Sequence, residues 1–497
     1  MLIVTLPITM NVHHLPDLST LEHVDALEFR LDYFIGALNI EQIALLRRAS
    51  PVPVIFTLRC PRQGGHYPHS TAQRLRDMTL LCALNPDYVD LEYDVPHDVM
   101  VELHERFPEI QWIISYHNFQ ETPIDLLAIM QAIQHPLVHR YKMVTQANST
   151  LDALRMLQFV WSCTPTYTLM GFCMGEEGQC TRILCPLFGS FGTYACLDSD
   201  LATAPGQLTV HDMVNIYHVH QLNCKTKIYA LLGDPVHRSL GHRLHNQAMR
   251  SLGQNAVYIK LRIRANELAP VLHVCRALPF EGFSITMPWK ETVIPLLDAI
   301  EPSSQAIAAI NTVVKRDERL IGLNTDGLGT MQALEKFVVI EQQTILILGA
   351  GGAARAVAYE AVKRGAQVII MNRSLEKAKT LAHALNAPAY ELHQFPNMQA
   401  LAYTVIINTL PEPVFLEQKI HDIFAPSSFL PHIVAMDLVY QPLETLFLKQ
   451  ALRAGCHCIG GDKLFINQAL LQMKTWFGQA ISRREAYAVT FGESNAD

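Results

Sequence analysis

Short apolar runs alternate with amphipathic stretches through the first part of the chain. Segments such as 39–50, 71–85 and 124–134 carry apolar residues at three- and four-residue spacing, which is the periodicity of a helix packed on one face. Alternating strands and helices predict a parallel sheet, and eight such units within about 200 residues predict a closed (β/α)8 TIM barrel. The eight predicted strands are 2–6, 26–30, 52–59, 88–93, 111–117, 140–145, 166–172 and 192–197.

Polar side chains gather where these predicted strands end. The C-terminal ends of barrel strands meet at one mouth, which is where such barrels carry their sites. Glu28 and Arg30 are two residues apart and so project from one face of their strand. Lys142 is unusual within a strand, because burying an ammonium is costly. The candidate site consists of Glu28, Arg30, Arg59, His117, Lys142, Arg182, Thr203 and Gln207.

Motifs around these residues resemble the type I dehydroquinate dehydratases over essentially all of residues 1–222. They are "LEFRLD" (27–32), "FTLRCPRQGG" (56–65), "SYHNF" (115–119), "YKMV" (141–144), "EGQCTR" (177–182) and "ATAPGQ" (202–207). The resemblance implies that Lys142 forms a Schiff base with the substrate ketone, that His117 shuttles protons, and that Arg182 binds the carboxylate. The residues implied to hold the hydroxyls and close the pocket are Glu28, Arg30, Arg59, Thr203 and Gln207.

The chemistry of this reaction agrees with those residue types. Eliminating water beside a ketone requires removal of a proton from the neighbouring carbon, which leaves negative charge behind. An iminium accepts that charge better than a ketone, and only a neutral amine forms one. Burial and neighbouring arginines favour the neutral form of a lysine. Histidine suits the base role because its ordinary pKa lies near working pH.

Two positions depart from the usual pattern of these dehydratases. Gln63 stands where many relatives carry glutamate, and an amide stabilises a protonated histidine less than a carboxylate does. We therefore expect a lower pKa for His117 and a shifted rate optimum. Thr203 replaces a common serine and keeps the hydroxyl.

A glycine-rich turn marks the second half of the chain. In "TILILGAGGAAR" (344–355) an apolar strand leads into Gly349-x-Gly351-x-x-Ala354, a helical run follows, and a second strand begins at Ala366. This strand–turn–helix context predicts a Rossmann dinucleotide-binding unit, in which the glycines let a pyrophosphate approach the N-terminus of the helix. The residues expected to contact the cofactor here are Gly349, Gly351, Gly352 and Ala353.

The end of the second strand indicates which dinucleotide binds. NAD-binding units usually place an acidic residue there to hold the ribose hydroxyl, whereas this chain has Asn372, Arg373 and Ser374. An arginine favours the additional phosphate of NADP. The sequence therefore predicts NADP as the cofactor, with some use of NAD.

Other motifs in this half resemble shikimate dehydrogenase over essentially all of residues 226–497. They are "ALLGDPVHRSLGHRLHN" (230–246), "GFSITMPWKE" (282–291), "AAINTVV" (308–314), "GLNTDG" (322–327), "MDLVYQP" (436–442) and "FINQAL" (465–470). The resemblance implies that Lys290 and Asp326 form the catalytic pair, which delivers a proton to the carbonyl oxygen while the nicotinamide supplies a hydride. The residues implied to contact the substrate are Ser239, Thr286, Asn311 and Gln468.

This half also departs from its family. The usual pair of serines is Ser239 and Gly241, a usual proline is His242, and Ser284 replaces a common asparagine. Losing one hydrogen bond to a charged group weakens binding by about 1.5–3 kcal/mol unless it is replaced. We expect weaker substrate binding with activity retained.

Composition narrows the remaining choices. A net charge of −7 argues against a nucleic-acid binder, no run is long enough to span a membrane, and "MLIVTLPITM" is a better first strand than a signal peptide. The 11 scattered cysteines fit reduced thiols in cytoplasm. "CHC" (456–458) and "HVH" (218–220) lack a second ligand pair at zinc spacing, so no metal is expected.

The two resemblances together predict a bifunctional enzyme, because the product of the first reaction is the substrate of the second. We expect a dehydratase barrel at 1–222, a substrate-binding domain at 226–330 with 461–497, and an NADP-binding domain at 331–460. Two alternatives stay open. One is a quinate-preferring dehydrogenase in the second half. The other is a non-catalytic sensor of pathway intermediates, although such a sensor would not need complete sets of proton-transfer residues.

Overall fold

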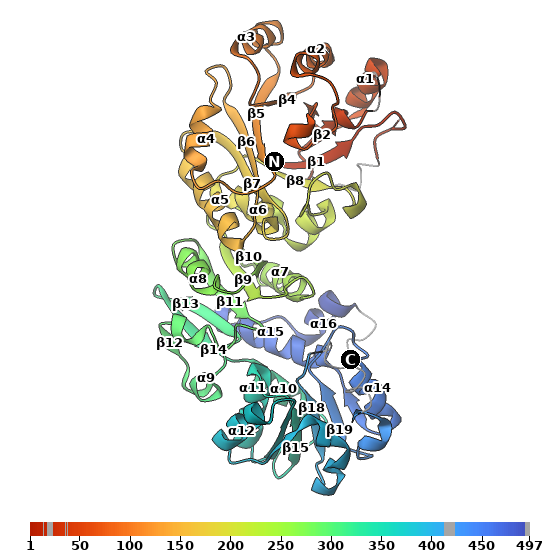
Figure 1. Cartoon of the computed structure of the whole chain (residues 1–497), viewed down its shortest axis with the longest axis vertical. Coiled ribbons are helices and arrows are strands. Elements are labelled where there is room, and N and C mark those ends of the chain that lie inside the picture. Colours follow the sequence, from red (N-terminus) through yellow and green to blue (C-terminus); the bar gives the residue numbers. More distant parts are fainter. Residues whose placement is uncertain (13, 17–22, 35, 37, 412–422, 493–497) are drawn as a thin grey trace. The chain divides into compact units, whose positions relative to one another are not determined.

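The chain folds into two compact units (Figure 1). The computed structural model describes residues 1–12, 14–16, 23–34, 36, 38–411 and 423–492. The first unit consists of Met1–Lys227 and Asn255–Ala277, and the second consists of Ile228–Gln254 and Leu278–Asp497. Among the described residues no helix has the length and apolar character needed to cross a membrane.

Eight parallel strands form the wall of the first unit. Neighbours follow the order β7-β6-β5-β4-β3-β2-β1-β8, and the backbone amide of Phe191, just before β8, donates to the carbonyl of Leu169 in β7 (3.1 Å). This is the predicted barrel, nearly closed. The strands are β1 (Leu2–Pro7), β2 (Ala26–Arg30), β3 (Val54–Thr57), β4 (Tyr88–Glu92), β5 (Gln111–Asn118), β6 (Arg140–Gln146), β7 (Thr168–Met174) and β8 (Thr193–Cys196).

Several helices between the strands start at polar caps and bury one apolar face. The side chains of Asn39, Ser70 and Ser149 each accept a hydrogen bond from a backbone amide in the first turn of the following helix. Leu46 and Leu157 are buried members of the apolar faces. These helices are α1 (Ile40–Ala49), α2 (Thr71–Cys82), α3 (His97–Arg106), α4 (Leu126–Ala132), α5 (Thr150–Cys163) and α6 (Gln179–Leu184). β10 (Ala256–Arg262) and α8 (Leu268–Arg276) also belong to this unit.

The second unit begins with a mixed sheet. Its strands follow the order β9-β11-β13-β14-β12, in which β9 and β11 are parallel while β11 and β13 are antiparallel. The strands are β9 (Lys227–Gly233), β11 (Phe280–Ile285), β12 (Ala299–Ile300), β13 (Thr312–Arg316) and β14 (Arg319–Leu323). The helices near this sheet in sequence are α7 (Gly241–Ser251), α9 (Pro302–Ile307) and α10 (Asp326–Leu334), and α15 (Gly461–Phe477) and α16 (Arg483–Phe491) come from the end of the chain.

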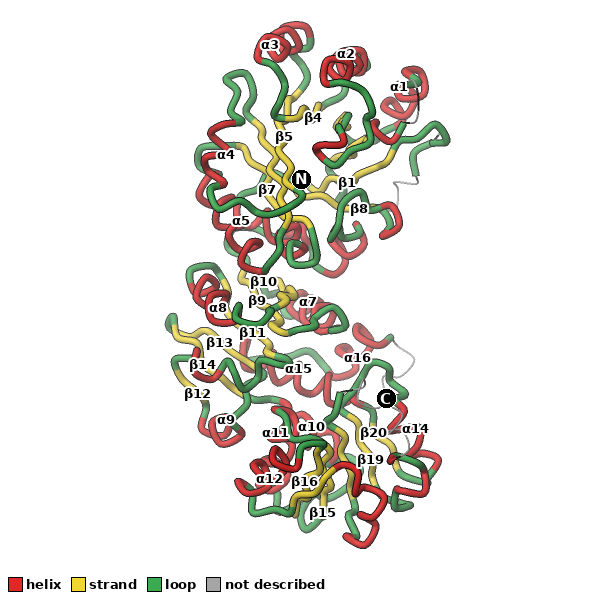
Figure 2. Tube along the Cα trace, in the orientation of Figure 1, coloured by secondary structure: helices red, strands yellow, loops and turns green. Residues whose placement is uncertain are grey.

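A six-stranded parallel sheet, ordered β17-β16-β15-β18-β19-β20, completes this unit (Figure 2). Ile345 and Ile347 pack into one core, whereas Leu346 and Leu348 pack into the other, because successive strand residues point to opposite faces. The doubly wound sheet is the predicted Rossmann architecture. Its elements are β15 (Thr344–Leu348), α11 (Gly352–Lys363), β16 (Gln367–Asn372), α12 (Leu375–Ala384), β17 (Ala389–Glu391), β18 (Val405–Asn408), β19 (Val434–Asp437), α14 (Leu446–Arg453) and β20 (His457–Ile459).

Candidate active sites

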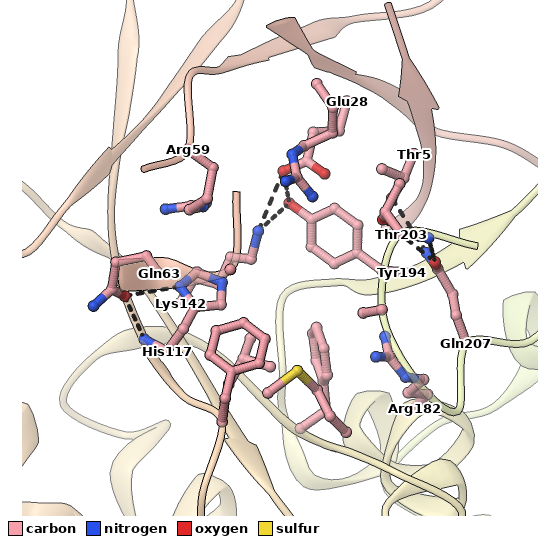
Figure 3. A pocket seen from close by; sticks show the side chains of 17 residues that line it. Thr5, Glu28, Arg59, Gln63, His117, Lys142, Arg182, Tyr194, Thr203 and Gln207 are labelled. Carbon is pink, nitrogen blue, oxygen red and sulfur yellow. Dashed lines mark hydrogen bonds and ion pairs between the residues drawn. The ribbon is translucent and has the colours of Figure 1, made fainter. Parts of the chain in front are cut away.

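One pocket at the mouth of the barrel contains every site residue predicted for the first half of the chain (Figure 3). The side chains come from different strands, with Glu28 in β2, His117 in β5 and Lys142 in β6. Arg182 reaches the pocket from α6, which follows β7. The predicted residues that line the pocket are Glu28, Arg30, Arg59, His117, Lys142, Arg182, Thr203 and Gln207.

Lys142 is buried, and its ammonium has three hydrogen-bond partners. Nζ donates to Oε1 of Glu28 (3.2 Å), to Oδ2 of Asp90 (3.0 Å) and to the hydroxyl of Tyr194 (3.1 Å). The sequence suggested arginines as the neighbours that would favour a neutral amine. The structure places two carboxylates, those of Glu28 and Asp90, against Nζ.

Arg59 binds one of these carboxylates. Its guanidinium donates to Oδ2 of Asp90 (2.7 Å) and to the hydroxyl of Ser115 (2.6 Å), and Ser115 in turn donates to Oδ1 of Asp90 (2.5 Å). Burial acts to raise the pKa of Asp90, but the charges of Arg59 and Lys142 outweigh it and hold that pKa well below its ordinary value. Asp90 therefore stays ionised.

His117 contacts the residue that departs from the family pattern. Its Nδ1 lies 3.2 Å from Oε1 of Gln63, and the same oxygen accepts the backbone amide of His117 (2.9 Å). Burial lowers the pKa of His117 well below 6.5, and the charges of Arg59 and Lys142 lower it further. The imidazole is thus neutral at neutral pH and able to accept a proton. The expected effect of Gln63, a lower pKa than a glutamate at this position would give, stays a prediction.

Arg182 is a buried cation without a counterion among the described residues. Its Nε and Nη2 atoms have no hydrogen-bond partner there, and the guanidinium lies 4.6 Å from the centre of the Phe172 ring. Burial lowers the pKa of Arg182 to about 10, which leaves the group charged near neutral pH. An unpaired buried charge is costly. The pocket is therefore complementary to an anion.

The remaining predicted residues close the rim of the pocket. Arg30 forms a two-bond ion pair with Asp32 (2.8 Å for each bond). Gln207 accepts the backbone amide of Thr203 (2.9 Å) and donates to the hydroxyl of Thr5 (3.3 Å), which links the loop after β8 to β1. These contacts hold donors and acceptors toward the pocket.

Sequence reasoning missed two residues that contact Lys142, namely Asp90 and Tyr194. Asp90 and Glu92 alternate with Val89 and Leu91 in β4, so a pair of carboxylates two residues apart in a buried strand was the available signal. Tyr194 lies in an apolar run, and no sequence pattern distinguishes it from an aromatic residue of the core. Its contacts become evident in the folded barrel.

The second site is built around an ion pair in the second unit. Nζ of Lys290 donates to Oδ2 of Asp326 (2.6 Å). The side-chain amide of Asn311 donates to Oδ1 of Asp326 (2.7 Å) and to the hydroxyl of Thr325 (2.9 Å). Asn311 therefore fixes one carboxylate oxygen and leaves the other to Lys290. The structure brings these three predicted residues together.

The other predicted substrate contacts lie in separate segments of this unit. Ser239 accepts the backbone amide of Gly241 (3.1 Å) just before α7. Thr286 follows β11, where its backbone amide donates to the carbonyl of Leu232 (2.9 Å). Gln468 lies in α15 and donates to the carbonyl of Phe465 (3.2 Å). Their part in substrate binding stays a prediction.

A buried glutamine lies behind the second site and was not predicted. Gln472 accepts the hydroxyl of Ser284 (3.0 Å) and donates to the backbone carbonyl of Asn311 (3.2 Å) and to the hydroxyl of Thr312 (3.1 Å). Ser284, one of the departures from the family pattern, thus bonds to a side chain of α15. The sequence contains no periodic signal for a contact between residues 188 positions apart.

The glycine-rich turn has the geometry of a dinucleotide-binding cradle. Gly349 has φ +117°, and a Cβ there would lie 2.2 Å from Oγ1 of Thr409. A Cβ at Gly351 would meet nothing within 4 Å, so open space adjoins the N-terminus of α11. At Gly352 it would lie 3.1 Å from Cβ of Lys290, so this glycine allows the helix to approach the ion pair. Ala353 follows in the first turn.

The end of β16, the strand that pairs with β15, carries polar and basic residues. The side chain of Asn372 donates to the carbonyl of Ser374 (3.1 Å), and the hydroxyl of Ser374 caps α12. Arg373 is exposed. The three predicted residues therefore run from the last residue of β16 to the N-cap of α12, at the strand end where such sheets bind ligands.

The described residues contain no cluster of three or more histidine, cysteine, aspartate or glutamate side chains placed to hold a metal ion. All eleven cysteines are free thiols.

A barrel with a buried amine at its mouth and a dehydrogenase-type unit with a dinucleotide cradle define the class, a lyase fused to an oxidoreductase. Family profiles match both parts: type I 3-dehydroquinase at residues 2–224, shikimate dehydrogenase substrate binding domain at 231–313, and shikimate/quinate 5-dehydrogenase at 331–439. The chain is 32% identical over 475 residues to the chloroplastic bifunctional 3-dehydroquinate dehydratase/shikimate dehydrogenase of Arabidopsis thaliana, covering 91% of this chain and 78% of that protein. It belongs to this bifunctional family.

Two further relatives match the second half alone. A shikimate dehydrogenase (NADP(+)) of Pyrococcus furiosus is 37% identical over 259 residues, which cover 52% of this chain and 93% of that protein. The crystal structure of shikimate dehydrogenase from Aquifex aeolicus is 33% identical with a TM-score of 0.50, and the match covers 55% of this chain and 99% of that chain.

Proposed function

We propose that the first half converts 3-dehydroquinate to 3-dehydroshikimate through a Schiff base on Lys142, and that the second half reduces this product to shikimate with NADPH. Family membership supports the two activities. The observation that carries the assignment of residues is the barrel pocket, which holds a buried amine, a neutral imidazole and an unpartnered guanidinium together.

Lys142 supplies the nucleophile of the first reaction. Its neutral amine attacks the ketone carbon, and loss of water from the resulting carbinolamine leaves a protonated imine. The positive nitrogen withdraws electrons from the neighbouring carbon and so acidifies the proton there. Hydrolysis of the imine after elimination releases the product ketone and restores the amine.

His117 handles the protons of the elimination. Because its imidazole is neutral, it takes the proton from the carbon beside the imine and becomes an imidazolium. The imidazolium then gives this proton to the departing hydroxyl group, which leaves as water. The histidine ends the cycle neutral, so one residue serves as base and acid in turn.

Arg182 binds the carboxylate that the substrate carries. A carboxylate there would satisfy the two nitrogen atoms that lack partners, and ion pairs in such a dry site are strong. Glu28, Arg30, Arg59, Thr203 and Gln207 line the remainder of the pocket and fix the hydroxyl groups.

In the second reaction Lys290 gives a proton to the carbonyl oxygen, and Asp326 holds the ammonium in place. NADPH, when bound, supplies the hydride. Gly349, Gly351, Gly352 and Ala353 fit the pyrophosphate, because open space adjoins the helix N-terminus at Gly351. At the end of β16, Asn372, Arg373 and Ser374 would hold the ribose and its phosphate. Ser239, Thr286, Asn311 and Gln468 would orient the substrate.

The predicted boundaries remain part of this proposal. The dehydratase domain comprises 1–222, the substrate-binding domain 226–330 with 461–497, and the NADP-binding domain 331–460. The eleven free thiols support a reducing compartment such as the cytoplasm. The ligands are small molecules of the shikimate pathway.

Loss of NADPH absorbance in purified protein given 3-dehydroquinate alone tests the proposal, because both activities must act in sequence. The Lys142→Met variant separates the candidate functions. We expect this variant to stay silent with 3-dehydroquinate and to consume NADPH with 3-dehydroshikimate. NADPH loss with 3-dehydroquinate in this variant would mean direct reduction to quinate, and silence of the parent with both substrates would favour a sensor.

A further inference from the structure

Tyr194 in β8 is in contact with the amine of the first site (Figure 3). Its hydroxyl accepts a hydrogen bond from Nζ of Lys142 (3.1 Å) and donates to Oε1 of Glu28 (3.3 Å). Nζ also lies 4.2 Å from the centre of the tyrosine ring. The side chain is 3% exposed, so these contacts are made away from bulk water.

The direction of these hydrogen bonds follows from the protons available. A lysine ammonium has three protons, and the structure offers three acceptors, namely Glu28, Asp90 and Tyr194. The phenol has a single proton, and Oε1 of Glu28 accepts it. Lys142, Tyr194 and Glu28 therefore form a triangle of hydrogen bonds, in which Nζ reaches Oε1 of Glu28 directly (3.2 Å) and also through the phenol.

The Schiff base requires that the ammonium first lose a proton, and the two carboxylates differ as acceptors. Asp90 is bound by Arg59 (2.7 Å) and Ser115 (2.5 Å), and the surrounding charges hold its pKa well below the ordinary value. Glu28 pairs with Lys142 itself and accepts a hydroxyl from Thr57 (2.9 Å). Glu28, which also accepts the hydroxyl of Tyr194, is thus the carboxylate that the phenol reaches.

We propose that Tyr194 is a catalytic residue that relays a proton from Lys142 to Glu28. The ammonium gives a proton to the phenol oxygen while the phenol gives its own proton to Glu28, which leaves a neutral amine and a carboxylic acid. After the amine has added to the ketone, the proton returns through the phenol to the carbinolamine hydroxyl, which departs as water. Glu28 is again ionised, and no other reactant is needed.

The phenol itself stays protonated throughout the resting state. Burial raises the pKa of Tyr194 well above its ordinary value, and the negative charges of Glu28 and Asp90 raise it further. A phenolate would hold the ammonium in its charged form, whereas a neutral phenol passes a proton on. This inference rests on the proposed Schiff base at Lys142.

The test compares Tyr194→Phe with Tyr141→Phe. The first variant keeps the ring beside Nζ and removes only the relaying oxygen. The second removes a hydroxyl from the same barrel wall that bonds to the backbone carbonyl of Val138 (2.8 Å), outside the pocket. NADPH consumption with 3-dehydroshikimate, measured on the same polypeptides, reports whether each variant is folded.

For Tyr194→Phe we expect kcat of the dehydratase to fall by about tenfold or more, since general acid–base groups contribute about 100-fold or more, with little change in KM. Borohydride trapping of the Lys142 adduct, followed by mass spectrometry, becomes slower by a similar factor. The acid limb of the kcat/KM profile, which His117 sets in the proposed mechanism, should stay in place. Tyr141→Phe should match the parent in all three measurements.

A kcat within twofold of the parent, a change in KM alone, or an unchanged trapping rate would each overturn the relay. If Tyr194→Phe does not fold, the Glu28→Gln variant tests the relay, because an amide cannot accept the proton. Trapping should slow equally in that variant, and an unchanged rate overturns the relay. Absence of any trapped adduct in the parent would instead refute the proposed role of Lys142.

Discussion

The ionisation of single residues in the barrel pocket follows from their immediate neighbours. Asp90 is ionised because Arg59 and Lys142 surround it, and His117 is neutral because burial and the same two cations disfavour its charged form. An ionised carboxylate and a neutral imidazole are thereby held beside the same two cations. Two predictions concern individual side chains of this pocket.

Gln63→Glu is expected to move the dehydratase pH profile. His117 acts as a neutral base, so kcat/KM falls as pH drops through its pKa, and the acid limb of the parent lies below pH 6.5 because that pKa is lowered. A carboxylate in place of Oε1, 3.2 Å from Nδ1, stabilises the imidazolium and raises the pKa. The acid limb should move to higher pH. Superimposable kcat/KM profiles would contradict this account of Gln63.

Arg182→Met separates binding from stability. Loss of the guanidinium should raise KM for 3-dehydroquinate roughly 10- to 100-fold, because a hydrogen bond to a charged group contributes about 1.5–3 kcal/mol. The free energy of unfolding of the substrate-free protein should stay equal or rise, since the variant removes an unpaired buried charge. Steady-state kinetics and denaturant titration measure both effects.

Arg140→Met is the matched control for this substitution. Arg140 is the first residue of β6. It donates to the side chain of Gln111 (2.6 Å) and does not line the pocket. Its KM should equal that of the parent. A lower stability for Arg182→Met would show that the guanidinium has a structural partner.

The elements around the glycine-rich turn are positioned by the alternation of side chains along β15 and by the glycines of the turn. Alternate residues of β15 point into the two cores on opposite faces of the sheet, and this packing holds the strand in place. The turn after it must then change direction within a few residues before α11 begins. Gly349 makes this possible because φ of +117° is a conformation that other residues rarely adopt.

Alanine at two glycines of this turn should have opposite consequences. Gly349→Ala places a Cβ 2.2 Å from Thr409, so the free energy of unfolding should fall by at least about 1 kcal/mol and NADPH binding should weaken. Gly351→Ala meets nothing within 4 Å in the protein, so stability should stay within about 0.5 kcal/mol of the parent. Its KM for NADPH should still rise, because the methyl group occupies the approach of the pyrophosphate.

Denaturant titration and steady-state kinetics distinguish the two variants, and dehydratase activity serves as the control for the barrel. An unchanged KM for NADPH in Gly351→Ala would place the pyrophosphate elsewhere.

At the scale of the whole molecule, the residues proposed for each activity lie within one unit. The barrel pocket draws its lining from residues 5–207, and the Lys290–Asp326 pair with the glycine turn lies within the second unit. In the part of the chain that the structure describes, neither proposed set includes a residue of the other unit. The two reactions should therefore be separable by substitution.

A mixture of two inactivated proteins tests this separation. Lys142→Met retains the reductase, and Lys290→Met retains the dehydratase. Neither protein alone should consume NADPH with 3-dehydroquinate, whereas an equimolar mixture should do so after a lag, because the intermediate diffuses between molecules. A silent mixture of proteins that each keep their remaining activity would show that the intermediate passes only within one chain.

The sequence by itself determined the local conformations and the chemistry of the motifs. Apolar periodicity reports which face of a segment is buried, so it located all eight barrel strands and the β15–α11–β16 unit. The residues at strand ends could be assembled into one mouth because a parallel barrel brings those ends together. The same argument placed the glycine turn between a strand and a helix.

Only the tertiary structure decided which groups touch. Lys142 bonds to Glu28, 114 positions away, and to Asp90 and Tyr194, each 52 positions away. Such contacts depend on strand register and on closure of the barrel, neither of which leaves a periodic trace in the chain. Arg30 and Arg59 bind carboxylates of the pocket region, and residues 255–277 group with the barrel unit. Local pattern records burial, whereas the partners of a buried charge are set by the packing of distant segments.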